Sequence, residues 1–233
     1  MHIGLIGGIG VAATLVYYER LVKAVHALGG VLDLTIVHAD VQELIRNNLA
    51  DQREVQAESY ARLIGRLQAA GCDCAAITSL GGHFCFAETI AISPLPLVSG
   101  VDPLDACFAE SGVQRVGLLG SGVVMRTRLY GQLVRTRSVV LDDEVDILDR
   151  TYLDVAVAGV CMDDQRFLFF DAGRRMIEDH GADAIVLAGT DLGLAFDGHD
   201  PGYTVVDALD LHVDLLARLA VGRVSLADAG ASP

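Results

Sequence analysis

The sequence is poor in positive charge. Its 17 lysine and arginine residues are outnumbered by 31 aspartate and glutamate residues, which gives a formal net charge of -14. Such an acidic surface repels nucleic-acid phosphates and anionic lipid headgroups. We therefore expect no nucleic-acid partner and no membrane partner, and favour small-molecule chemistry.

The sequence also lacks long apolar runs and a regular cysteine pattern. No stretch reaches the roughly 18 uncharged apolar residues of a membrane span, and the start, "MHIGLIGGIG", has no basic segment before an apolar one. The five cysteines are odd in number and irregularly spaced, which favours reduced thiols and a cytoplasmic location. Cys72 and Cys74 have no second pair or histidine cluster beside them, so we expect buried thiols and no metal site.

Short β-branched runs alternate with longer segments of helical period, over a chain that is 52% hydrophobic. This alternation is typical of βαβ units around a parallel sheet, and it predicts an α/β protein. The expected strands are 2–6, 32–38, 73–78, 115–119, 138–142, 184–188 and 203–206.

Two segments of the first half have a faint copy in the second half. "HIGLIGGIGVAATLVYYERLV" (2–22) aligns with "RVGLLGSGVVMRTRLYGQLV" (115–134), and "GCDCAAITSLGG" (71–82) aligns with "GADAIVLAGTDL" (181–192). Internal repeats of this kind indicate a duplicated structural unit. We expect two pseudo-symmetric Rossmann-like lobes with mainly parallel sheets.

The proline-rich segment "SPLPLVSGVDP" (93–103) predicts the boundary between the lobes. Lobe 1 is expected to hold residues 1–98 and about 207–224, and lobe 2 residues 99–206, with a flexible tail at 225–233. Ligands of such sheets bind at the carboxyl ends of the strands. A cleft between 78–83 and 188–193 is the expected binding site.

The loop "GLIGGIGVAA" fits the G-x-G-x-x-A spacing of a dinucleotide-binding turn through Gly8, Gly10 and Ala13. Asp40, after the second strand, would then be the ribose-binding acid. An NAD-dependent dehydrogenase is therefore one hypothesis. The copy of this loop in the second half, "GSGVVMR", would make a second such site, which an NAD enzyme does not need.

Four segments together resemble the aspartate/glutamate racemase superfamily. They are "IGLIGGIGVAAT" with "YYERLV", then "ITSLGGHF", "VLAGTDL" and "VVDALDLHVDLLARLA", which span nearly the whole chain. The resemblance implies an enzyme without an organic cofactor, acting at the carbon next to a carboxylate, and a homodimer. In this family one cysteine from each lobe exchanges a proton with that carbon.

Both family cysteines are replaced in this chain. Alignment on His83 places Ser79 at the first cysteine, and alignment on Thr190 places Gly189 at the second. A hydroxyl ionises far less readily than a thiol, whose pKa lies near 8.5, so it acts as a base only when a neighbour accepts its proton. Ordinary two-thiol racemisation therefore cannot be carried over.

Three residues are candidate catalytic groups. Ser79 is a candidate nucleophile, relay or hydrogen-bond donor, and His83, four residues later, is its candidate proton acceptor. Asp191 is a candidate acid or base, if burial raises its pKa. The structural alternatives are a helix cap for Ser79 and Asp191, and a packing role for His83.

The candidate substrate-binding residues lie at strand ends, where hydroxyls, backbone N–H groups or a guanidinium meet a carboxylate. They are Gly8, Asp40, Thr78, Gly81, Arg126, Gly189 and Thr190. Asp40 would hold an amino group instead, and a solvated helix arginine is the structural alternative for Arg126.

The preferred function is thus a racemase-like or epimerase-like isomerase with a small carboxylate or amino-acid substrate. One-sided chemistry is a close alternative, namely a decarboxylase, a lyase or a cyclase that needs one proton donor. A catalytically silent homologue that binds a carboxylate is a third hypothesis, and the NAD-dependent dehydrogenase a fourth.

Overall fold

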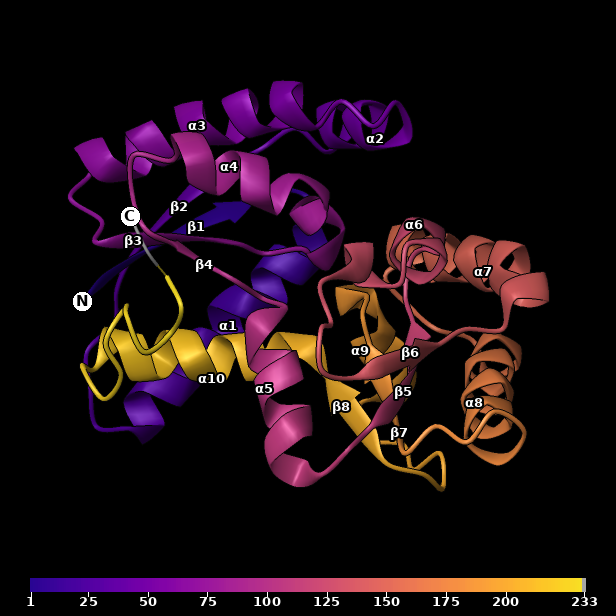
Figure 1. The fold of residues 1–233 in the computed structure, drawn as a ribbon. Helices are drawn as coiled ribbons and strands as arrows, with labels where there is room; N and C mark the ends of the chain where they lie inside the picture. The colour runs from indigo at the N-terminus through magenta and orange to yellow at the C-terminus, as the bar shows by residue number, and fades with distance from the viewer. Residues whose placement is uncertain (232–233) are drawn as a thin grey trace. The chain divides into compact units, whose positions relative to one another are not determined.

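The computed structural model describes residues 1–231, which divide into two compact units. Unit 1 comprises residues 1–100 and 210 onward, and unit 2 comprises residues 101–209. Each unit contains one four-stranded sheet, and the strand orders are β2-β1-β3-β4 and β6-β5-β7-β8. Every pairing of named strands is parallel. The α/β class and the duplicated, parallel-sheet architecture are confirmed (Figure 1).

Unit 1 packs helices on both faces of its sheet, with α3 and α4 on one side and α1 and α10 on the other (Figure 1). Its strands are β1 (His2–Gly7), β2 (Asp33–His38), β3 (Cys74–Ile77) and β4 (Leu97–Val98). Its helices are α1 (Val11–Ala27), α2 (Val41–Leu49), α3 (Arg53–Ala69), the 3-10 turn η1 (Leu80–Cys85), α4 (Phe86–Ile92) and α10 (Ala208–Ala220), whose first two residues fall in unit 2.

Unit 2 repeats the strand order with different helices. Its strands are β5 (Arg115–Leu119), β6 (Arg137–Val139), β7 (Ala184–Leu187) and β8 (Val205–Asp207). Its helices and 3-10 turns are α5 (Asp102–Ser111), α6 (Gly122–Arg126), η2 (Leu129–Gly131), η3 (Asp142–Glu144), α7 (Val145–Ala158), α8 (Asp163–Glu178), η4 (Thr190–Leu192) and α9 (Gly193–Phe196).

Matching glycines in the two central strands allow helices to pack closely. A Cβ on Gly4 would lie 2.9 Å from the carbonyl oxygen of Cys74 and from a methyl group of Leu67 in α3. A Cβ on Gly117 would lie 2.4 Å from a methyl group of Ile185 and 2.9 Å from the sulfur of Met176 in α8. The sequence repeat therefore reflects one packing requirement met twice.

Two local expectations are corrected by the structure. Strand β4 was not expected, because two residues flanked by prolines give no periodic signal; it forms by pairing of Leu97 with Ala75. We also expect an inner helix face that includes Val55, Tyr60, Ile64 and Leu67, but Val55 is 48% exposed while the other three are fully buried.

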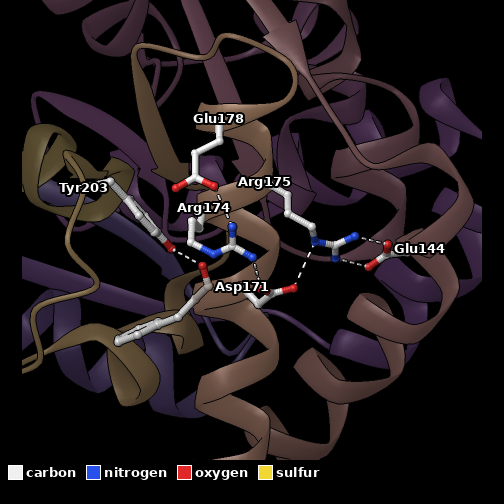
Figure 2. Close-up of polar contacts among 7 residues, drawn as sticks. Glu144, Asp171, Arg174, Arg175, Glu178 and Tyr203 are labelled. Atoms are coloured by element: carbon white, nitrogen blue, oxygen red, sulfur yellow. Dashed lines mark hydrogen bonds and ion pairs between the residues drawn. The ribbon is translucent and has the colours of Figure 1, made fainter.

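In unit 2 a cluster of ion pairs connects α8 to the turn η3. Both terminal nitrogens of Arg175 contact the carboxylate of Glu144 at 2.5 Å, and its Nε lies 2.9 Å from Asp171 (Figure 2). Arg174 bridges Asp171 and Glu178 on the same helix. The paired fork of an arginine on a carboxylate fixes orientation as well as distance, so this cluster holds α8 against the start of α7.

The end of the chain carries ordered contacts as far as it is described. The amino group of Met1 donates to the carbonyl of Ala220 at 2.8 Å, and Ser225 and Asp228 bond each other. Ala231 is buried. The expected flexible tail at 225–233 lies partly outside the described residues, and its mobility stays a prediction.

Candidate functional site

The strand-end turn of unit 1 follows β3 and places Ser79 in extended backbone, with φ -154° and ψ 127°. The N–H of Thr78 donates to the carbonyl of Ile6 at 3.1 Å, and the N–H of Gly82 donates to the carbonyl of Ser79 at 3.1 Å. The Ser79 side chain is partly exposed and caps no backbone N–H of the turn it precedes. Its hydroxyl is therefore available to a ligand.

The strand-end turn of unit 2 has the same backbone geometry. Gly189 precedes η4 with φ -143° and ψ 120°. The N–H of Ala188 donates to the carbonyl of Leu119 at 2.7 Å, and the N–H of Leu192 donates to the carbonyl of Gly189 at 3.0 Å. Ser79 and Gly189 thus occupy equivalent positions in the two units.

His83 lies at the core of the unit 1 turn and is fully buried. Its Nδ1 donates to the carbonyl oxygen of Ser79 at 2.8 Å, and its Nε2 accepts from the N–H of Gly100 at 3.0 Å. The ring stacks on Phe86 with centroids 4.9 Å apart. Burial lowers the pKa of His83 to about 4, so the ring is neutral near pH 7.

This arrangement engages both ring nitrogens of His83 with the backbone. The expected transfer of a proton from the Ser79 hydroxyl to His83 has no ring nitrogen available to it here. The geometry instead fits a positioning role, in which His83 fixes the turn that presents Ser79.

Asp191 lies in η4 and is 9% exposed. Burial raises the pKa of its carboxyl group, and a hydrogen bond from the hydroxyl of Tyr152, at 3.1 Å to Oδ2, opposes that shift. A partly buried carboxyl with a raised pKa suits proton transfer near neutrality. Of the three candidate catalytic residues, Asp191 has the environment closest to the expected one.

The glycine loop after β1 is closed by its own hydroxyls. Gly8, with φ +89°, donates its N–H to Thr14 Oγ1 at 2.9 Å, and that hydroxyl donates to the carbonyl of Gly10 at 3.0 Å. Thr78 Oγ1 donates to the carbonyl of Ile6 at 3.0 Å. The structure brings Gly8 and Thr78 to one strand edge, with their donors already bonded within the protein.

The other expected binding residues are placed as follows. Asp40 is exposed and caps α2 by accepting from the N–H of Gln42 at 2.8 Å. Arg126 is about half exposed and pairs with Asp146 on α7. Gly81 and Thr190 are partly exposed in the two strand-end turns.

Sequence reasoning missed Tyr152, the side chain that contacts both Gly189 and Asp191. It lies on α7, which belongs to neither repeated segment, so the internal repeat could not point to it. The available signal was the spacing of Asp146, Asp149 and Tyr152, which places the three on one side of a helix.

Three further searches of the described residues bear on function. None of the helices in residues 1–231 is long and apolar enough to cross a membrane. No group of three or more histidine, cysteine or acidic side chains there could hold a metal ion. A hollow of about 610 Å³ in unit 1, lined by α1 and the amino end of β2, lies at the opposite sheet edge from Ser79.

Two duplicated parallel sheets with equivalent strand-end turns define the racemase-type two-lobe architecture, and comparison with known proteins agrees. The family model of Asp/Glu/Hydantoin racemases matches residues 6–216. The chain belongs to this family. A comparison with curated proteins gave no significant match.

Similar solved structures carry the same fold. A candidate Asp/Glu racemase from Yersinia pestis has a TM-score of 0.82 at 22% identity, covering 95% of this chain and 100% of its own. An aspartate racemase homologue from Pyrococcus horikoshii has a TM-score of 0.81 at 23% identity, covering 94% and 99%. An aspartate racemase from Picrophilus torridus has a TM-score of 0.67 at 19% identity, covering 100% and 96%.

Proposed function

We propose that this chain is a racemase-family enzyme that exchanges a proton at the carbon next to a substrate carboxylate, without an organic cofactor. The equivalence of Ser79 and Gly189 in the two strand-end turns carries the proposal, because it marks the places of the family's two thiols. The solved relatives are described as aspartate or glutamate racemases. A small acidic amino acid is therefore the substrate class to test first.

In this proposal Asp191 is the group of unit 2 that takes up and returns the proton. A carboxyl with a raised pKa is a useful base and acid near neutrality. Ser79 donates its hydroxyl to the carboxylate or to the enolate-like oxygen that forms from it. Thr190, Gly81 and Arg126 are proposed contacts for the substrate carboxylate, with Arg126 exchanging Asp146 for the ligand.

One-sided chemistry is the second candidate, and His83 favours it. With both ring nitrogens bonded to the backbone and a pKa of about 4, His83 does not supply the base that Ser79 would need for proton transfer. A reaction with a proton donor on one face fits a decarboxylation or an elimination, as well as exchange with retained configuration.

The test is proton exchange in heavy water. The L and D forms of aspartate and glutamate, together with phenylmalonate, are incubated with the protein, and deuterium at the α-carbon is followed by NMR. Exchange with inversion supports a racemase, exchange with retention supports one-sided chemistry, and release of carbon dioxide from phenylmalonate supports a decarboxylase. Binding of these acids without any exchange would contradict the proposal and favour a silent homologue.

Asp191→Asn and Ser79→Ala separate the two roles. Loss of the proton-transferring carboxyl should slow exchange by about 100-fold or more. Loss of a single hydroxyl donor should slow exchange by a similar factor if it stabilises the transition state, and should raise KM alone if it merely binds the carboxylate. NADH that leaves the melting temperature unchanged would remove the dehydrogenase hypothesis.

A further inference from the structure

The place of the family's second thiol is filled by an aromatic ring. A Cβ on Gly189 would lie 2.6 Å from Cε2, 2.9 Å from Cζ and 3.1 Å from the hydroxyl oxygen of Tyr152. Gly189 has extended backbone that any residue can adopt, so backbone strain does not demand glycine here. Glycine is required because the phenol of Tyr152 occupies the space beside it.

The Tyr152 hydroxyl is directed at a carboxylate. It donates to Asp191 Oδ2 at 3.1 Å, and both residues are buried with a small exposed remainder, 8% for Tyr152 and 9% for Asp191. A buried polar pair of this kind is costly unless its hydrogen bonds are made. The pair is therefore held in one arrangement, with an oxygen atom beside the position where a thiol would begin.

Helix α7 fixes Tyr152 through two contacts on the same side of the helix. Asp149 Oδ1 accepts from the N–H of Gly122 at 2.7 Å, and Asp146 pairs with Arg126. Both partners belong to the segment that follows β5, so one face of α7 joins the segments after β5 and β7. A side chain anchored in this way meets the precision that a proton-transferring group needs.

We propose that the Tyr152 hydroxyl, coupled to Asp191, replaces the missing thiol as the proton-transferring group of unit 2. The inference rests on the proposed function. In the forward step the substrate Cα–H bond breaks, and its proton forms a new O–H bond on Tyr152 while the original phenol proton moves to Asp191 Oδ2. The electron pair of the C–H bond passes into the substrate carboxylate, and the reverse sequence returns a proton to Cα.

The relay explains why two residues stand where one thiol is expected. A phenolate is expensive at this site, because burial raises the pKa of Tyr152 well above its usual value. Passing the proton through to Asp191 avoids a free phenolate, since the carboxylate gains a proton as the phenol loses one. Asp191 alone lacks the contact with Gly189 that places an oxygen at the thiol position.

Tyr152→Phe is the decisive variant, because it keeps the ring packed on Gly189 and removes the hydroxyl alone. We expect α-deuterium exchange of aspartate or glutamate in heavy water to fall by about 100-fold or more, chiefly in kcat. Tyr203→Phe is the matched control, since Tyr203 is a tyrosine of the same unit whose hydroxyl bonds the carbonyl of Phe170. Its exchange rate should stay at the wild-type value.

A second test restores the thiol. Tyr152→Ala opens the space beside Gly189, and Tyr152→Ala with Gly189→Cys places a sulfur there. We expect the single variant to be slow and the double variant to regain at least 10-fold of the lost exchange rate, with sensitivity to iodoacetamide that the single variant lacks. Thiolate formation should then set the pH dependence of the double variant.

The outcomes separate this inference from the proposed function. Wild-type exchange with an equal rate in Tyr152→Phe would overturn the role of Tyr152 and leave the proposed function standing. An equal loss in Tyr203→Phe would overturn it as well, because the effect would then come from packing. No exchange by the wild-type protein with any acid of the panel would overturn both.

Discussion

Unit 1 and unit 2 share a backbone but differ in what surrounds the same strand-end position. Ser79 and Gly189 have matching extended conformations and matching hydrogen bonds to the 3-10 turn that follows. In unit 1 a buried histidine supports the turn from behind and the hydroxyl is left available. In unit 2 a phenol covers the glycine and bonds a carboxyl group. Duplication has preserved the scaffold, while the chemistry of the two copies has diverged.

The helices that follow the first strands differ in the same way. Helix α1 has 17 residues, whereas its counterpart α6 has 5 and is followed by Arg128, Leu129 and Tyr130 with positive φ. The sequence repeat extends to residue 134, but the helix stops at Arg126. Three consecutive non-glycine residues in the left-handed region are costly, and surrounding contacts must hold them.

The largest expected difference between the units is their response to acid. His83 and His212 in unit 1 are fully buried, and burial lowers their pKa to about 4 and about 3. Below pH 6.5 the unfolded chain binds protons that the folded rings refuse. Stability present above pH 6.5 is therefore lost as the pH falls toward 4, by roughly 3 kcal/mol per histidine.

Asp191 gives unit 2 the opposite contribution. Its raised pKa means that the folded carboxyl binds a proton before the unfolded one, so this group adds stability as the pH falls toward its ordinary value. Amide hydrogen exchange at pH 7 and pH 4.5, corrected for intrinsic rates, should show unit 1 losing protection first. His212→Gln should reduce the slope of stability against pH, and equal losses in both units would contradict the comparison.

Cysteine substitutions at the two equivalent positions should have unequal effects on stability. Gly189→Cys forces a Cβ against the ring of Tyr152 and should cost about 1–3 kcal/mol in the free energy of unfolding. Ser79→Cys replaces a hydroxyl by a thiol at a partly exposed position and should change it by less than about 0.5 kcal/mol. Urea denaturation followed by circular dichroism measures both, and equal costs would break the comparison.

The ion-pair cluster on α8 should contribute more than the exposed pairs of unit 1. Arg175 makes a two-pronged contact with Glu144 at about 70% burial of both side chains, whereas Arg20 meets the more exposed Asp210 with a single nitrogen (Figure 2). We expect Arg175→Ala to cost about 1 kcal/mol and Arg20→Ala less than that. Melting temperatures of the two variants, repeated in 0.5 M salt, test the order.

The smallest expected effect is that of Arg126→Ala on stability. The pair with Asp146 joins an arginine side chain that is 48% exposed to an aspartate that is 85% exposed, and exposed pairs contribute about 0.2–1 kcal/mol at most. We expect the stability change at the low end of this range and a several-fold increase in KM, because Arg126 is a proposed carboxylate contact. An unchanged KM would remove it from the binding site.

Much of the fold could be predicted because its signals are local and repeated. Alternation of buried strands with amphipathic helices indicates a parallel sheet, and the two aligned segments indicate duplication. Helix α6 and strand β4 could not be predicted, since their lengths depend on packing rather than periodicity. The candidate site was predicted in part: Asp191 lies in the environment expected of it, while the ring nitrogens of His83 bond the backbone.

The sequence alone determined the α/β class, the duplication, the racemase-type strand-end motifs and the absence of both thiols at positions 79 and 189. These properties are written in residue types and spacings along the chain. The tertiary structure alone decided that Tyr152 covers Gly189 and that Gly100 occupies the second nitrogen of His83. Those contacts join segments far apart in the sequence, and packing on a shared sheet brings them together.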